Sequence, residues 1–256
     1  MLNYIKSEIY RITRTKGIYL SFIFCALTIF AFNFALFYFK NQEGFRYGTT
    51  KFSYSSIYTS MNVLIYFVIL ICTVVQGDEY KYHTFKNSVA AGVKRSTMYF
   101  GRFLAEVVVC ILFYVTISGL HIILGESLLK NSGVEYMNIL VKSLLVCIPI
   151  FLACAAISHC FYYVFDNGVV AIVGVFSVVI VASKIIEFTA LKLVFLRKIV
   201  PYLITNILNA KWDEAYNLTL TWDTTEGLVR TIAVGVVATI AFCIIGYEIF
   251  KKKELK

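Results

Sequence analysis

The chain has 256 residues, of which 59% are hydrophobic and 15% are charged. Average soluble domains carry fewer apolar and more charged residues, so this composition excludes an ordinary soluble domain and favours a protein embedded in a membrane. The formal net charge is +9. We attribute it to the excess of Lys and Arg that membrane proteins keep on the cytoplasmic side of the bilayer, and we expect no nucleic-acid partner.

The N-terminal segment, residues 2–16, has the pattern of an amphipathic helix, because apolar side chains recur at spacings of three and four. We expect this helix to lie in the headgroup plane of the membrane, with its cations toward anionic lipid. The alternative is a plain beginning of the first span, but Gly17 is expected to separate the two helices. The membrane-interface residues of this helix are Ile5, Ile9, Ile12, Arg11 and Arg14.

Six hydrophobic runs are long enough to cross the hydrocarbon core of a bilayer, which takes roughly 20 helical residues. Their centres have no polar face of the kind that a soluble amphipathic helix shows. The sequence therefore predicts an all-α membrane protein with six transmembrane helices, formed as one transmembrane domain over residues 1–256. The spans lie at about 18–39, 57–76, 100–124, 139–164, 168–186 and 230–249.

A short basic connector joins the second and third predicted spans. Glu79 suits the positive end of a helix dipole, and Gly92 suits the end of a helix. Between them, Tyr82, Phe85 and Val89 share one face at spacings of three and four. We predict a cytoplasmic helix that lies parallel to the membrane, followed by a second helix that enters the third span.

The remaining connections set the topology. Asp166 and Asn167 belong to a tight hairpin between spans four and five, and Pro149 is expected to kink span four. Residues 187–229 mix apolar and basic side chains, which favours two short helices in or on the outer leaflet. The N-terminal segment, the connector and the C-terminal tail are all basic and fall on one side if the spans alternate, so we expect both termini in the cytoplasm.

A few ionisable side chains lie at membrane depth, where they are costly and often functional. Glu106 is the deepest, and we expect it to pair with Arg102 one helical turn earlier; the alternative is a contact with a proton or a substrate. His159 precedes a cysteine, which hints at metal binding, but packing or a polar contact between helices is the favoured interpretation. We predict no metal, no cofactor and no catalytic residue in this chain, and we interpret the seven cysteines as small apolar packing residues.

The connector and the start of the third span resemble a sequence pattern of ABC-2 transporter permeases, E…GT-K-N…GVSR…Y-x-GK. The layout of helices and loops agrees with this family over almost the whole chain. Two positions depart from the pattern, because His83 replaces a glycine and Arg102 replaces a lysine. The positions that carry the resemblance are Glu79, Thr84, Lys86, Asn87, Gly92, Val93, Lys94, Arg95, Ser96, Tyr99, Gly101 and Arg102.

The resemblance implies a transporter of two permeases and two separate cytoplasmic ATPases. The chain has no Gly-Lys dipeptide and hence no P-loop, so ATP and Mg²⁺ would be bound by the partner. Residues 78–92 would form the main ATPase-coupling element, and the hairpin would make a smaller second contact. The ATPase-coupling residues that it implies are Glu79, Tyr82, Phe85, Lys86, Val89, Asp166 and Asn167.

Small permeases of this size resemble those of Gram-positive peptide and antibiotic exporters, including lantibiotic-immunity and phenol-soluble-modulin exporters. This implies a multi-pass protein of a Gram-positive cell membrane, paired with an identical or related permease, that exports an amphipathic peptide. Two other function classes stay open. A membrane enzyme acting on lipid or peptide would need a polar catalytic cluster, for which Glu106 and His159 are the candidates. An ion-coupled transporter would show inverted repeats and broken helices, a feature that Pro149 alone suggests.

Overall fold

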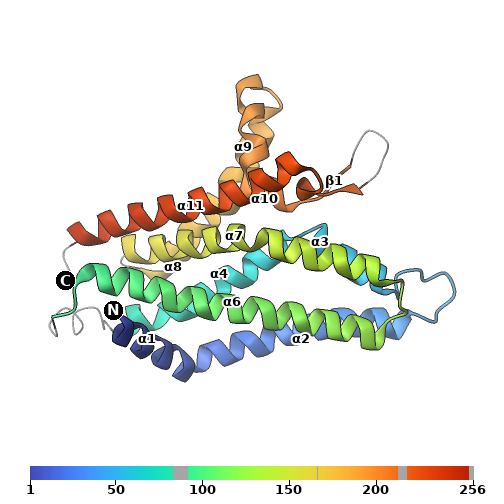
Figure 1. Cartoon of the computed structure of the whole chain (residues 1–256), viewed down its shortest axis with the longest axis horizontal. Coiled ribbons are helices and arrows are strands. Elements are labelled where there is room, and N and C mark those ends of the chain that lie inside the picture. Colours follow the sequence, from blue (N-terminus) through green and yellow to red (C-terminus); the bar gives the residue numbers. More distant parts are fainter. Residues whose placement is uncertain (83–91, 166, 213–217, 254–256) are drawn as a thin grey trace.

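The computed structural model describes residues 1–82, 92–165, 167–212 and 218–253, without the side chains of residues 78–82. Long helices run side by side along the molecule, and both termini lie at the same end (Figure 1). We call this the terminal end of the bundle. The long helices are α2 (Lys16–Phe39), α4 (Asn62–Tyr82), α6 (Arg95–Leu128), α7 (Val134–Val164) and α11 (Thr225–Lys252).

Five helical segments of the described chain are long and apolar enough to span a membrane: α2, α6, α7, α11 and Gly168–Ala190. The last of these is composite. It consists of α8 (Gly168–Phe176), a π-helical turn η1 (Ser177–Val181) and α9 (Ala182–Ala190). A π turn is a common cause of a bend, and α9 stands out sideways from the bundle in Figure 1. The structure is therefore that of a predominantly helical membrane protein.

The expected second span, 57–76, starts too early. The structure has a separate helix, α3 (Thr50–Tyr58), and a break before α4 at Asn62. Backbone pairing across the molecule causes the break, because the Met61 N–H donates to the Leu208 carbonyl and the Ala210 N–H donates to the Thr59 carbonyl. The apolar part of α4 is Asn62–Gly77, which is shorter than the five segments above.

The N-terminal helix α1 (Leu2–Arg14) is separate from α2, as expected, but the break falls at Thr15 and not at Gly17. Thr15 has an extended backbone, with ψ of 114°. Gly17 lies inside α2, where a Cβ atom would come within 2.7 Å of Val74 Cγ1. The glycine thus permits close approach of α2 to α4, and α1 packs against α6.

Helix α7 lies at the centre of the bundle and packs against α3, α4, α6, α8 and α11. Its contact with α11 depends on glycine: a Cβ at Gly235 would lie 2.6 Å from Pro149 Cβ, and one at Gly246 would lie 3.0 Å from Cys160 Cα. Small residues at such seams allow membrane helices to approach closely. Pro149 lies inside α7, as the sequence indicated.

The segment from 187 to 229 contains more pieces than the two helices expected. A short antiparallel hairpin pairs Lys211 with Thr219 and Trp212 with Leu218, so the fold is not strictly all-α. In Figure 1, β1 and α10 lie near the start of α11, on the same side of the bundle as α9. The pieces are η2 (Val194–Lys198), η3 (Val200–Tyr202), α10 (Ile204–Leu208), β1 (Lys211–Trp212), β2 (Leu218–Thr219) and η4 (Thr221–Asp223).

Candidate functional site

Most of the expected ATPase-coupling element lies outside the described residues. This holds for Phe85, Lys86, Val89 and Asp166, and α4 contains Glu79 and Tyr82 without a description of their side chains. Their roles stay predictions. Two other coupling positions can be placed. Asn167 caps α8, because its side-chain oxygen accepts from the Val169 N–H at 2.8 Å. Gly92 has a φ of 80°, the left-handed conformation that suits the end of a helix.

The terminal end is held together by cations that bind backbone carbonyls. Arg95 opens α6, and its Nη1 donates to the carbonyls of Lys251 at 2.7 Å and Lys253 at 2.8 Å. Lys253 Nζ donates in turn to the carbonyls of Tyr163 and Val164, both at 3.1 Å. The start of α6, the end of α7 and the end of α11 are thus tied to one another.

An ion-pair cluster joins α1 to α6 at this end. Arg102 donates from Nε and Nη2 to the two carboxylate oxygens of Glu8, both at 3.1 Å. Arg11 also binds Glu8, at 2.9 Å. Burial alone would raise the pKa of the Glu8 carboxyl, but Arg102 and Arg11 outweigh burial and lower this pKa below its ordinary value. The expected pair of Arg102 with Glu106 is wrong, because Glu8 on the neighbouring helix occupies Arg102.

The side chains of the membrane-interface residues of α1 fall into two groups: most pack against the rest of the protein, and one is exposed. Ile12 is 1% exposed and belongs to the core, while Ile5 and Ile9 are partly buried and pack against it. Arg11 turns toward the protein, where Nη2 also approaches the Val75 carbonyl at 3.4 Å, so the expectation that it faces lipid is corrected. Arg14 is exposed and lies over the Tyr10 ring.

Glu106 belongs to a second cluster, buried between three helices. His159 Nδ1 on α7 lies 2.7 Å from Glu106 Oε2 on α6. Gln76 on α4 donates from Nε2 to the same carboxylate oxygen at 2.8 Å. Glu106 and His159 are both fully buried. The favoured interpretation of His159, a polar contact between helices, is confirmed.

The other contacts of His159 complete this Glu106–His159 cluster. His159 Nε2 lies 3.2 Å from the Tyr99 carbonyl, which can only accept, so this nitrogen is the donor. Gln76 Nε2 also lies 2.8 Å from His159 Nδ1, so the amide contacts both members of the pair. These mutual contacts lower the cost of placing the polar groups at membrane depth.

A third cluster lies further along α6 and contains only neutral groups. Asn33 on α2 donates from Nδ2 to His121 Nδ1 at 3.1 Å, and the Ser53 hydroxyl of α3 donates to Asn33 Oδ1 at 2.9 Å. His121 Nε2 closes the triangle at 3.4 Å from Ser53 Oγ. His121 therefore carries its proton on Nε2 and accepts at Nδ1.

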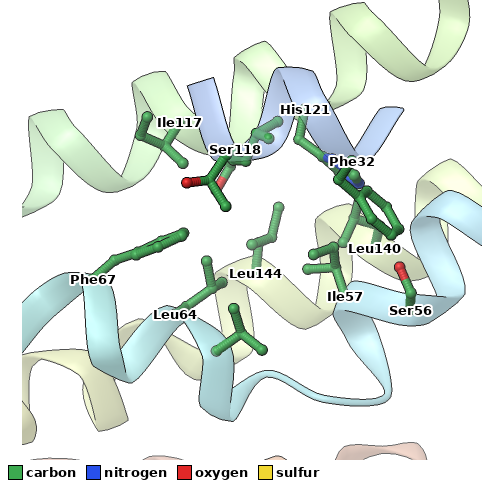
Figure 2. A pocket seen from close by; sticks show the side chains of 13 residues that line it. Phe32, Ser56, Ile57, Leu64, Phe67, Ile117, Ser118, His121, Leu140 and Leu144 are labelled. Atoms are coloured by element: carbon green, nitrogen blue, oxygen red, sulfur yellow. The ribbon is translucent and has the colours of Figure 1, made fainter. Parts of the chain in front are cut away.

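A cavity of about 250 Å³ lies beside this neutral triangle, among α2, α3, α4, α6 and α7. Figure 2 shows aliphatic and aromatic side chains around it, with the hydroxyls of Ser56 and Ser118 at its edge. No ionised side chain lines it. The lining residues are Thr28, Ile29, Phe32, Ser56, Ile57, Val63, Leu64, Phe67, Ile117, Ser118, His121, Leu140 and Leu144.

Sequence reasoning missed the partners in all three clusters. Glu8, the sole acidic residue of a basic amphipathic helix, was a usable signal for a buried pair. Asn33 and Gln76 were also visible as isolated amides within hydrophobic runs. Which helix would supply the partner of each group could not be predicted, because the partners on other helices lie between 20 and 94 residues away in the chain: Asn33 and Ser53 are 20 apart, and Glu8 and Arg102 are 94 apart.

A comparison with known protein families identifies the chain. The model of a family described as "ABC-2 family transporter protein" matches residues 4–183, which include α1 to α8 and the connector between α4 and α6. No curated protein and no solved structure showed significant similarity. The chain belongs to the ABC-2 transporter family and is a membrane-spanning permease component of an ABC transporter.

Proposed function

We propose that the chain is the permease of an ATP-driven exporter that moves a hydrophobic or amphipathic cargo, with an amphipathic peptide as the expected class, out of a Gram-positive cell. Members of this family work in general with a cytoplasmic ABC ATPase. Two permeases, identical or related, and two ATPase subunits would make up the transporter, with ATP and Mg²⁺ on the ATPases. Membership in a transport family speaks against the alternatives of a membrane enzyme and an ion-coupled transporter.

In this proposal the terminal end faces the cytoplasm, and α4 is the sixth span. The charge distribution supports the orientation, because Lys6, Lys16, Lys94 and Lys252 add to the basic side chains already described there. The pieces between α9 and α11 would then lie at the outer leaflet. Their exposed apolar side chains, including Phe195 at 65% exposure, suit that place.

The family match across the connector is the observation that carries the proposal. Residues 78–92 would bind a groove of the ATPase, with Asp166 and Asn167 as a second contact. Force applied there would reach three spans at once, because Gln76, Glu106 and His159 join α7 to α4 and α6, the two helices that the connector links.

The test is reconstitution of the chain with the cytoplasmic ABC ATPase that works with it. Phe85→Asp and Lys86→Glu are expected to abolish ATP-dependent efflux of a labelled amphipathic peptide from proteoliposomes and to remove the stimulation of ATP hydrolysis. Lys192→Glu, a matched charge reversal at an exposed site near α9, should leave both signals unchanged. Full transport in the two connector variants would refute the coupling role.

A further inference from the structure

The cavity of about 250 Å³ beside His121 has walls that leave almost no polar atom for an occupant. The Thr28 hydroxyl donates to the Phe24 carbonyl at 2.9 Å, and the Ser56 hydroxyl donates to the Ser53 carbonyl at 2.7 Å. His121 uses both ring nitrogens in the neutral triangle. These walls therefore offer an occupant mainly dispersion contacts.

Ser118 is the exception. Its Oγ is buried, and the described residues supply it with no hydrogen-bond partner. One orphan hydroxyl cannot hold a cluster of water, since a buried water typically makes about three hydrogen bonds to polar partners. Apolar cavities of this kind stay dry and accept apolar ligands, because an empty cavity forfeits the contacts of its walls.

The cavity also reaches the surface of the bundle. Thr28 on α2 and Val63 on α4 line it, and both are exposed, Val63 at 40%. The helices α2 and α4 are neighbours, so the mouth lies between them. Along the spanning helices this position is surrounded by hydrocarbon, where alkyl chains are the most abundant apolar groups.

From this geometry we propose that the cavity binds a single alkyl chain, which enters from the membrane between α2 and α4. A charged peptide segment is disfavoured, because the lining residues include no ionised side chain to receive its charges. The polar head of the bound amphiphile stays outside, at the mouth. The site is independent of the proposed export and of its direction, and it lies in the half of the membrane away from the termini.

The experiment uses the full chain in lipid nanodiscs and a palmitic acid with a diazirine in its chain. After irradiation, mass spectrometry is expected to find the label concentrated on α4 near Phe67 and on α6 near Ser118. Ser118→Phe fills the cavity and should lower this labelling several-fold. Thr28→Phe narrows the mouth from an exposed position and should act in the same direction, so the test does not depend on one variant folding.

Leu112→Phe is the matched control, because Leu112 is 63% exposed on the same helix and does not line the cavity. It should leave the labelling unchanged. Lipid extraction then separates two sources of the chain: a phospholipid retained by the native protein and lost in Ser118→Phe identifies a resident lipid tail, whereas labelling without retained phospholipid identifies a free single-chain amphiphile.

Either source supports the proposal. Labelling that is uniform over the lipid-facing residues, or equal in both cavity variants and the native protein, would overturn it. Cross-linking of the mouth to a second copy of the chain would also overturn it, since a partner helix would then cover the cavity.

Discussion

The two histidines in the described part of the chain, His121 and His159, are both buried but have different partners. His159 lies near the terminal end, with Nδ1 at 2.7 Å from Glu106 Oε2 and at 2.8 Å from Gln76 Nε2. His121 lies in the other half, bonded to the amide of Asn33 and the hydroxyl of Ser53. Both histidines join three helices, and both are buried. One cluster is built around a carboxylate, and the other contains no ionisable group except the imidazole itself.

The difference indicates how each half tolerates change. Removing one partner of a buried ion pair typically costs about 3–5 kcal/mol, whereas orphaning a neutral buried group costs about 1–3 kcal/mol. Breaking the cluster around Glu106 is therefore expected to cost more free energy than breaking the neutral triangle around His121. A more rigid contact between helices near the proposed ATPase site, and a more adaptable one beside the proposed alkyl-chain site, would suit these two functions.

The largest effect is expected from Glu106→Gln. The substitution leaves His159 and Gln76 without the carboxylate, and we expect a loss of about 3–5 kcal/mol in the free energy of unfolding. Thermal unfolding of the purified chain in detergent measures it. Glu248→Gln is the control, because Glu248 is an exposed carboxylate on α11. Equal unfolding temperatures for the two variants would show that the Glu106 carboxyl does not stabilise the fold through His159 and Gln76.

Replacing the whole cluster sharpens the test. Glu106→Leu combined with His159→Leu and Gln76→Leu should be more stable than Glu106→Gln, because apolar side chains in place of all three polar groups leave none of them without a partner.

Glu8→Gln is expected to have the next largest effect. It removes the charged acceptor of Arg102 and Arg11, and hydrogen bonds to charged groups contribute about 1.5–3 kcal/mol. The loss should be local to the contact between α1 and α6. Hydrogen exchange of α1 amides in nanodiscs measures it, with Lys6→Gln on the exposed face of α1 as the control. Unchanged protection in Glu8→Gln would show that the cluster does not hold α1.

The same contact should weaken in acid. Because Arg102 and Arg11 lower the pKa of folded Glu8 below the ordinary value of 4.5, the pair contributes its full stability above that pH. The contribution is lost as the pH falls through the lowered folded pKa. The protection factors of the α1 amides, which correct for the intrinsic pH dependence of exchange, should therefore be constant above the ordinary carboxyl value of 4.5 and should fall at lower pH, an acid response that Glu8→Gln abolishes.

A smaller effect is expected from Asn33→Ala in the neutral triangle. The change removes the partner of His121 Nδ1 and of the Ser53 hydroxyl, and we expect it to lower the free energy of unfolding by about 1–3 kcal/mol. Thermal unfolding should place this variant between the native chain and Glu106→Gln. A loss as large as that of Glu106→Gln would remove the contrast between the two halves.

The smallest effect is expected from Lys184→Ala. Lys184 and Glu187 form an ion pair on α9 at 2.6 Å, but the lysine side chain is 56% exposed. Exposed pairs contribute about 0–1 kcal/mol, so unfolding should be nearly unchanged. A large loss would show that α9 is buried against a second permease or another partner.

Features that depend on neighbouring residues were predicted from the sequence, whereas contacts between residues far apart in the chain were not. Hydrophobic runs placed five spans well, because each run is a local property of the chain. The start of α4 was missed, since the break depends on Met61 and Leu208, which are far apart in sequence. The Arg102 partner was missed for the same reason: a neighbour one turn away looked sufficient, but α1 supplies a carboxylate at 94 residues' distance.

The ties between Arg95, Lys253 and α7 bear on how the protein is made. Arg95 at the start of α6 donates to the carbonyls of Lys251 and Lys253 at the end of α11. Lys253 in turn donates to the Tyr163 carbonyl near the end of α7. During synthesis α6 emerges from the ribosome well before α11. Until α11 is made, the Arg95 guanidinium has none of its acceptors on α11. These contacts can form only after α11 has been synthesised, and a chain that stops before residue 250 would lack both the carbonyl acceptors of Arg95 and the Lys253 amine, so the ends of α6, α7 and α11 would not be joined.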